Sequence, residues 1–483
     1  MNYLKEHYRT IVPFAIIFCV LLLSSGLVII PIGSMWYYLI KFGAISLVIG
    51  LGIYFYSHKY MTSYLKLAII IPFSTDYHLH YAFIVLTIIL FNKKLLLPWN
   101  SIIKPIYILF IWCLFSYIVN QFVEINLLAF PLFIGTFFTP IITLPLFYIY
   151  ANEQNKKQIL LFFFSVIGIM CSIIILQTII WWNLNPDLRT GGLTDVHMAG
   201  TFLSFAVFLL TTKKIEFVSN FNKTIRNVLI LLFLLILFLI DAKYILFGLI
   251  LVTISITIVR NFYKSKLTYT ISILFLLVVS FLLYHFNAKI YLSVLSIEKQ
   301  NFRVQNFIDN FNNMPRGKLL YAACRLPQND INTFIFGAGP GTFMSRATEK
   351  RSIEKYNIWL REFDGPFKSI SNIYRQAIIF KDTWIQKRYV DNEAQNKLYA
   401  TSIFSNNGGL LSFYFELGIV GIIILLYFLF KISDIDNDPM KFVTSIVFFS
   451  LFIYAFGNWL EFPNYQLLFY ALVGLNIKHK NFA

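Results

Sequence analysis

The chain has 483 residues, of which 58% are hydrophobic and 13% are charged, and its mean hydropathy is +0.69. Soluble domains carry about 25% charged residues, so this composition excludes a soluble globular protein and predicts a polytopic membrane protein. The formal net charge of +17 does not indicate nucleic-acid binding, because most basic residues flank apolar runs and orient them in the membrane.

Apolar runs of about 14 to 25 residues are typical of membrane-spanning helices rather than of the strands of a barrel. In chain order, we expect spans at residues 11–31, 34–56, 102–123, 127–150, 158–181, 198–212, 227–240, 244–259, 267–286, 408–430, 441–457 and 464–477. Residues 67–73 and 79–92 are predicted to form a hairpin of two short segments. The first run follows MNYLKEHYRT without a small-residue cleavage site, which indicates a first helix rather than a signal peptide.

These elements predict an all-α polytopic membrane protein with about 12–14 transmembrane helices. Basic residues in the short loops fall on one face, which is therefore cytoplasmic and holds both termini. We expect three regions: a transmembrane bundle at 1–286, a large extracytoplasmic loop at 287–406, and further transmembrane helices at 407–483. The loop holds 17 Lys and Arg against 10 Asp and Glu, which fits either contact with acidic lipids or capture of an anionic substrate.

Several common catalytic motifs are missing from the sequence. It contains no GxxxxGK[ST], HExxH or GxSxG, so nothing indicates use of ATP, and the energy for any reaction must come from the substrate or a gradient. The segment GAGPG, Gly337–Gly341, lacks the strand and helix of a dinucleotide loop and predicts a tight turn. The four cysteines form no disulfide or metal pattern, and His78 and His80 beside Asp76 are too few ligands to predict a metal site.

The segment RTGGLTDVHMAG, Arg189–Gly200, interrupts two apolar runs with polar and glycine residues. Arg189 offers a planar, permanently charged group that suits a phosphate, or it extends to lipid headgroups. Asp195 is either a proton acceptor or the N-cap of the next helix. His197 is either a proton shuttle or a structural histidine at the membrane interface.

Charged residues also occur inside apolar runs. Asp241 and Lys243 divide LILFLIDAKYILFGL into two short spans, and they either serve a function or neutralise one another. Glu416, in FYFELGIVG, lies about two turns into its span. It is a candidate proton acceptor, a residue that orients an arginine, or the partner of a structural cation.

The large loop carries further basic residues, including Arg303 in RVQNFIDNF and Arg316, which precedes Tyr321 in RGKLLYAACRLP. Tyrosines and tryptophans alternate with these cations along the loop. Sugar CH faces stack on aromatic rings, so this pattern fits a groove for a sugar phosphate, although anchoring at the membrane interface explains part of it.

Four segments in this order resemble the O-antigen polymerase and O-antigen ligase superfamily of bacterial envelope glycan assembly. They are Arg189 followed by ten residues and then Gly200, the hairpin tip DAKY, Arg316 and Tyr321 followed by FGAGPGTF, and NNGGLLSFYFELGIVG. In the hairpin tip, Lys243 stands where relatives often have arginine. Ligases typically carry a histidine where this chain has Asn406 or Asn407, so the resemblance favours a polymerase and leaves the base unidentified.

The resemblance implies a GT-C-like membrane glycosyltransferase at the periplasmic face of the inner membrane, which polymerises oligosaccharide repeat units into O-antigen or capsule. Donor and acceptor glycans would each be carried on undecaprenyl diphosphate, without cofactor or metal. Arg189, Lys243, Arg303, Arg316, Tyr321, Asn406 and Asn407 would bind diphosphate and glycan, and Asp195, His197 or Glu416 would accept the proton. Membrane lipids and a chain-length regulator are the expected partners. A ligase, a flippase or other transporter, and a scaffold without chemistry remain alternatives.

Overall fold

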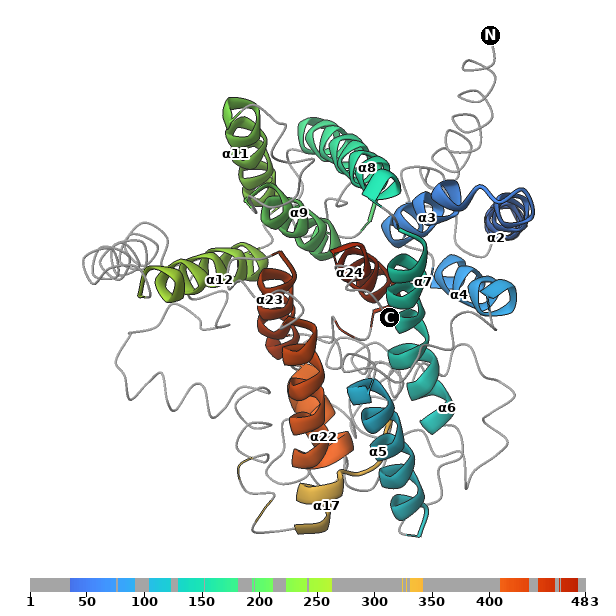
Figure 1. Ribbon diagram of the computed structural model, residues 1–483, viewed down its shortest axis with the longest axis vertical. Coiled ribbons are helices and arrows are strands. Elements are labelled where there is room, and N and C mark those ends of the chain that lie inside the picture. The colour runs from blue at the N-terminus through green and yellow to red at the C-terminus, as the bar shows by residue number, and fades with distance from the viewer. Residues whose placement is uncertain are drawn as a thin grey trace, which may run out of the picture.

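The computed structural model describes residues 35–74, 77–91, 104–122, 129–151, 153–180, 193–194, 196–211, 223–240, 243–262, 324, 327, 331–341, 409–433, 442–456, 460 and 462–476. Every element of regular structure in this part of the chain is a helix (Figure 1). The first half contains α2 (Met35–Ser57), α3 (Met61–Ile70), η1 (Ile71–Phe73), α4 (Tyr77–Phe91), α5 (Lys104–Gln121), α6 (Ala129–Phe133), η2 (Ile134–Phe138), η3 (Thr139–Ile142), α7 (Thr143–Tyr150) and α8 (Glu153–Ile180). The remainder contains α9 (Val196–Thr211), α11 (Lys223–Leu239), α12 (Lys243–Phe262), α17 (Ile331–Phe336), α22 (Gly409–Ser433), α23 (Phe442–Phe456) and α24 (Pro463–Asn476).

Four helical stretches in the described residues are long and apolar enough to cross a membrane: Leu39–Ser57, Phe130–Tyr150, Asn155–Ile180 and Gly409–Ser433. Large apolar side chains remain exposed on several helices, among them Phe42 at 66%, Ile180 at 70% and Leu231 at 66%. Contiguous exposed apolar surface is costly in water but favourable against lipid. The protein is therefore an all-α membrane protein, as the composition predicts.

The predicted spans within the described residues agree with observed helices to within a few residues. The predicted hairpin is also confirmed, as α3 with η1 and then α4. Its turn is fixed by His80, a fully buried residue whose Nε2 donates to the carbonyl oxygen of Ile71 at 3.0 Å. The predicted spans 11–31 and 267–286, and most of the loop at 287–406, lie outside the described residues.

The run from α6 to α7 is a helix whose hydrogen-bonding pattern changes three times, from α to π to 3₁₀ and back to α. Residues Ile134–Phe138 form a π-helical turn, and Thr139–Ile142 form a 3₁₀ turn that contains Pro140. Proline has no N–H to donate and cannot continue a regular α-helix without distortion. Threonine hydroxyls also donate to carbonyls one turn earlier in this run, from Thr136 to Leu132 O and from Thr139 to Gly135 O.

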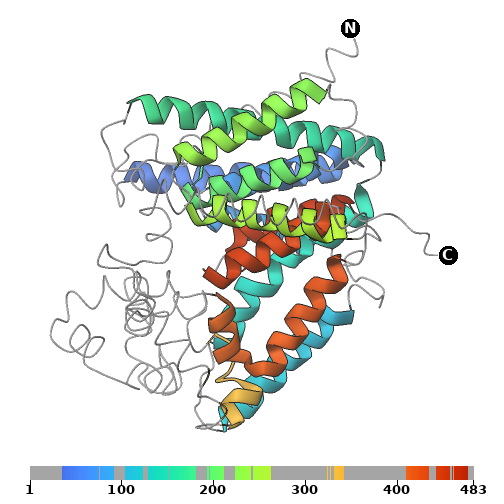
Figure 2. The same cartoon turned by 90° about the vertical axis from the view of Figure 1, so that its left-hand side faces the viewer.

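Helix α24 lies at the centre of the bundle, between α7 and α23 (Figures 1 and 2). Each of its residues from Pro463 to Leu475 is buried. Gly474 lets the backbone of α24 approach α7, since a Cβ there would meet the carbonyl oxygen of Leu144 at 2.6 Å. Helix α24 is apolar over most of its length. Side-chain hydrogen bonds between distant segments occur where α5, α17 and α22 meet.

Candidate functional site

Helix α22 is broken at Gly418, which has φ 69° and ψ −174°. This φ lies in the left-handed region that residues with a side chain rarely adopt. Figure 2 shows the two arms of α22 meeting at a bend beside α17. Although Gly409–Ser433 is long and apolar enough to span a membrane, the span predicted at 408–430 is therefore not one continuous helix.

A break in a helix deprives the carbonyls of the preceding turn of their usual N–H partners. Inside an apolar environment each such group must find another donor. Three successive carbonyls before the break accept hydrogen bonds from other elements: Phe415 from Ala338 N at 2.8 Å, Glu416 from Gly339 N at 3.0 Å, and Leu417 from Trp112 Nε1 at 2.9 Å. The bend is thus held by the turn after α17 on one side and by α5 on the other.

The turn Gly337–Gly341 uses all of its backbone donors within the protein. Gly337 N donates to Thr333 O at 2.9 Å, the next two N–H groups donate to α22, and Gly341 N donates to the Glu416 carboxylate. Pro340 has no N–H. The predicted tight turn is confirmed, with positive φ at all three of its glycines. Because a phosphate-binding loop needs free N–H groups, this geometry argues against a nucleotide at GAGPG.

Glu416 is fully buried, and its Oε2 accepts the hydrogen bond from Gly341 N at 2.7 Å. The residue lies two turns into α22, as predicted. Its backbone carbonyl and its carboxylate therefore both contact the same turn, one through Gly339 and the other through Gly341.

Helix α5 presents Trp112, Ser116 and Asn120 to this junction. The Ser116 hydroxyl donates to Phe336 O at 2.7 Å, and the Asn120 amide donates to Gly337 O at 3.1 Å. The Trp112 and Phe336 rings stack with their centroids 5.8 Å apart. Sequence analysis missed these three residues, although their four-residue spacing places polar atoms on one face of an apolar helix and could have identified them.

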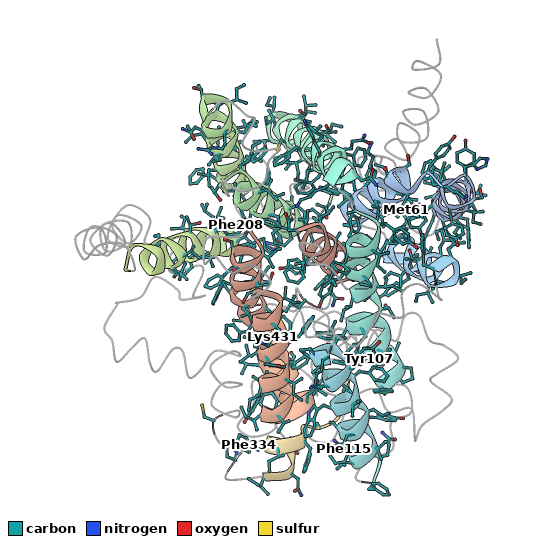
Figure 3. All side chains as sticks on the ribbon, in the orientation of Figure 1. Met61, Tyr107, Phe115, Phe208, Phe334 and Lys431 are labelled. Carbon is teal, nitrogen blue, oxygen red and sulfur yellow. The ribbon has the colours of Figure 1, made fainter. Side chains whose placement is uncertain are left out.

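Two glycines make the close packing of this junction possible. A Cβ at Gly337 would overlap the carbonyl of Glu416, and a Cβ at Gly418 would overlap the carbonyl of Ile335. Both residues also have positive φ. Figure 3 shows Phe115 of α5 and Phe334 of α17 at one end of the molecule, with Tyr107 and Lys431 further from it, so α5 runs antiparallel to the second arm of α22. We call the union of Trp112, Ser116, Asn120, Gly337–Gly341 and Phe415–Gly418 the junction.

Of the other predicted site residues, His197 is described with its side chain. It lies in the first turn of α9 and is partly buried, and its carbonyl accepts a hydrogen bond from the Thr201 hydroxyl at 3.0 Å. Helix α9 packs against α8, α11, α12 and α23, whereas α22 packs against α5, α17 and α23. Lys243 is the first residue of α12. Arg189, Asp195, Arg303, Arg316, Tyr321, Asn406 and Asn407 lie outside the described residues.

The histidine pair considered for metal binding does not form part of a larger ligand set in the described residues. No group of three or more His, Cys, Asp or Glu side chains occurs there. His80 Nε2 is occupied by the Ile71 carbonyl, whereas His78 is exposed. Cys113 and Cys171 are buried free thiols, and Cys324 is exposed.

The comparisons with known proteins add no relative. No protein-family model matches the chain, and no curated protein matches it either.

Proposed function

We propose that this chain is a membrane glycosyltransferase that polymerises lipid-diphosphate-linked oligosaccharide units at the extracytoplasmic face of the plasma membrane. The observation that carries the proposal is the hydrogen bond between Gly341 and Glu416. It joins two of the four segments that resemble the polymerase and ligase superfamily, FGAGPGTF and FYFELGIVG. Their pairing across the large loop supports treating them as parts of one functional unit.

In the proposed reaction, a hydroxyl of the acceptor sugar attacks the anomeric carbon of the donor. The bond between this carbon and the diphosphate oxygen breaks, and polyprenyl diphosphate leaves with the bonding electrons. Arg189, Lys243, Arg303 and Arg316 would stabilise the negative charge that develops on the leaving group. Tyr321, Asn406 and Asn407 would contact the glycan. The proton from the hydroxyl would pass to Asp195, His197 or Glu416.

The energy of this reaction is stored in the glycosyl diphosphate bond, so it requires neither nucleotide nor cofactor. The sequence lacks nucleotide-binding motifs, and the N–H groups of GAGPG are engaged within the protein. Both observations agree with a nucleotide-independent transferase.

A transporter is the main competitor, because transporters also use helices that are broken inside the membrane. In such proteins the freed carbonyls coordinate an ion or contact the substrate. Here the three carbonyls that precede the break instead accept bonds from Ala338, Gly339 and Trp112. The bend therefore serves to attach α22 to neighbouring elements, which favours the enzyme over the transporter.

Deletion of the gene, followed by electrophoresis of surface glycans, tests the proposal. Loss of a polymerase should leave the lipid A core with a single repeat unit and no ladder of longer chains. Loss of a ligase or a flippase should leave a core that carries no repeat unit. An unchanged ladder would contradict the proposal and favour a scaffold.

A further inference from the structure

The role of Glu416 is still open among the three candidate proton acceptors. A general base must reach the hydroxyl that it deprotonates. In this structure Glu416 is fully buried, and one carboxylate oxygen lies 2.7 Å from the backbone nitrogen of Gly341. The carbonyl of the same residue is held by Gly339 N at 3.0 Å. Both polar ends of Glu416 therefore contact the GAGPG turn.

The position of these bonds in the chain shows what they fix. Gly341 lies within the predicted outer loop, whereas Glu416 lies in the helix that follows it, 75 residues later. The Phe415 carbonyl, the Glu416 carbonyl and the Glu416 carboxylate all accept hydrogen bonds from the GAGPG turn. These bonds hold together the two ends of the segment between Gly341 and Glu416. A backbone turn rich in glycine can adopt many conformations. Its geometry therefore depends on the groups that accept hydrogen bonds from its N–H donors.

We infer that Glu416 is a positioning residue that fixes the base of the large loop through Gly341, and that the proton acceptor is another residue. The inference rests on the proposed function for its effect on polymerisation. The structural part of the inference is that the GAGPG turn depends on a hydrogen-bond acceptor at position 416. This part does not require the proposed function.

Helix α5 fixes the same turn from the opposite side. Asn120 donates to the carbonyl of Gly337 at 3.1 Å and to that of Ser116 at 2.8 Å. Three N–H groups of the turn, those of Ala338, Gly339 and Gly341, thus donate to α22, and the carbonyl of Gly337 accepts a hydrogen bond from α5. Removing Asn120 should loosen the same turn while leaving Glu416 in place, which provides an independent test of positioning.

The experiment compares Glu416→Gln, Glu416→Met and Asn120→Ala with the unchanged chain, in detergent and in cells that lack the native gene. Glutamine keeps an oxygen that accepts the bond from Gly341, whereas methionine fills a similar volume with only a weakly accepting thioether sulfur. Ser433→Ala, near the far end of α22, is the matched control, because its hydroxyl bonds to Phe430 O within its own helix. Hydrogen exchange of the peptide that contains Gly337–Gly341 and the length of the glycan ladder are both measured.

Glu416→Met and Asn120→Ala should raise exchange in this peptide by about tenfold or more, while Glu416→Gln and Ser433→Ala stay near the unchanged chain. The ladder should persist in Glu416→Gln and be strongly reduced in Glu416→Met. The inference is overturned if Glu416→Met leaves exchange unaltered. It is also overturned if Glu416→Gln loses the ladder as completely as Glu416→Met although its exchange and abundance are normal. If no variant affects any glycan but exchange responds as expected, the proposed function fails and the positioning role survives.

Discussion

The carboxylate of Glu416 and the backbone N–H of Gly341 form a buried hydrogen bond of 2.7 Å across 75 residues of sequence. This bond belongs to a set of contacts through which α22 can bend at Gly418 without leaving its carbonyls unsatisfied. The following predictions test the parts of this arrangement and the proposed chemistry separately.

Gly418→Ala should destabilise the protein strongly. The combination of φ 69° and ψ −174° lies in a region that is essentially confined to glycine and costs about 1–3 kcal/mol for a residue with a side chain, and the added Cβ would overlap the carbonyl of Ile335. Thermal unfolding in detergent measures the effect. Gly168→Ala in α8 is the control, since a Cβ there meets nothing within 4 Å, and alanine should leave stability unchanged or raise it by about 0.5–1 kcal/mol. Equal effects of the two substitutions would contradict the packing described.

Trp112→Phe should cost about 1–3 kcal/mol, because the carbonyl of the buried residue Leu417 loses its indole donor. The phenylalanine ring can still stack on Phe336, whose centroid lies 5.8 Å from that of Trp112. Chemical or thermal unfolding in detergent checks this value. Phe336→Leu, which removes the stacking but not the indole, should cost less than Trp112→Phe if the hydrogen bond is the larger contribution.

His80→Leu should destabilise the α3–α4 hairpin by about 0.5–1.5 kcal/mol, because the Ile71 carbonyl loses one of its two hydrogen bonds and keeps the one from Ser74 N at 3.0 Å. His78→Leu, at an exposed position, should change stability by no more than about 0.5 kcal/mol. If the two histidines instead formed a metal site, both substitutions would have similar effects, and a chelator would destabilise the unchanged protein.

Arg189→Gln and Arg316→Gln should each lower the rate of chain polymerisation by about 10²–10³-fold, the range for loss of a group that stabilises transition-state charge. The glycan ladder should collapse toward a single repeat unit, and purified enzyme with a lipid-linked repeat unit would give the rate. Lys157→Gln, an exposed residue of α8 on the predicted cytoplasmic side, is the control for loss of positive charge. An intact ladder in both arginine variants would remove the proposed diphosphate site.

Most of the helical architecture is accessible from the sequence, because the membrane requires long apolar runs and the runs are easy to recognise. Helices α2 and α23 begin and end within one residue of the predicted limits, whereas α8 begins five residues before its predicted start. Glu416 and the GAGPG turn were also recognised as unusual. Their pairing was not predicted, because the hydropathy of a segment contains no information about which distant segment supplies its hydrogen-bond donors.

The break at Gly418 was likewise not predictable from the sequence. Glycine within an apolar helix is compatible with a regular helix, a close contact or a bend, and these cases differ only in the neighbours. The carbonyls freed by the bend are satisfied by Trp112 on α5 and by the turn after α17, elements separated from it by long stretches of chain. The polar face of α5 was detectable from its four-residue spacing, but its partner was not.

The central place of α24 has a consequence for biogenesis. Its neighbours α3, α4 and α7 precede it in the chain. Helix α7 ends at Tyr150 and α24 begins at Pro463, so at about 5–20 residues per second roughly 15–60 s of translation separate them. During that interval the faces of α3, α4 and α7 that pack against α24 lack this partner, so the packing of this part of the bundle cannot be completed until α24 has been synthesised.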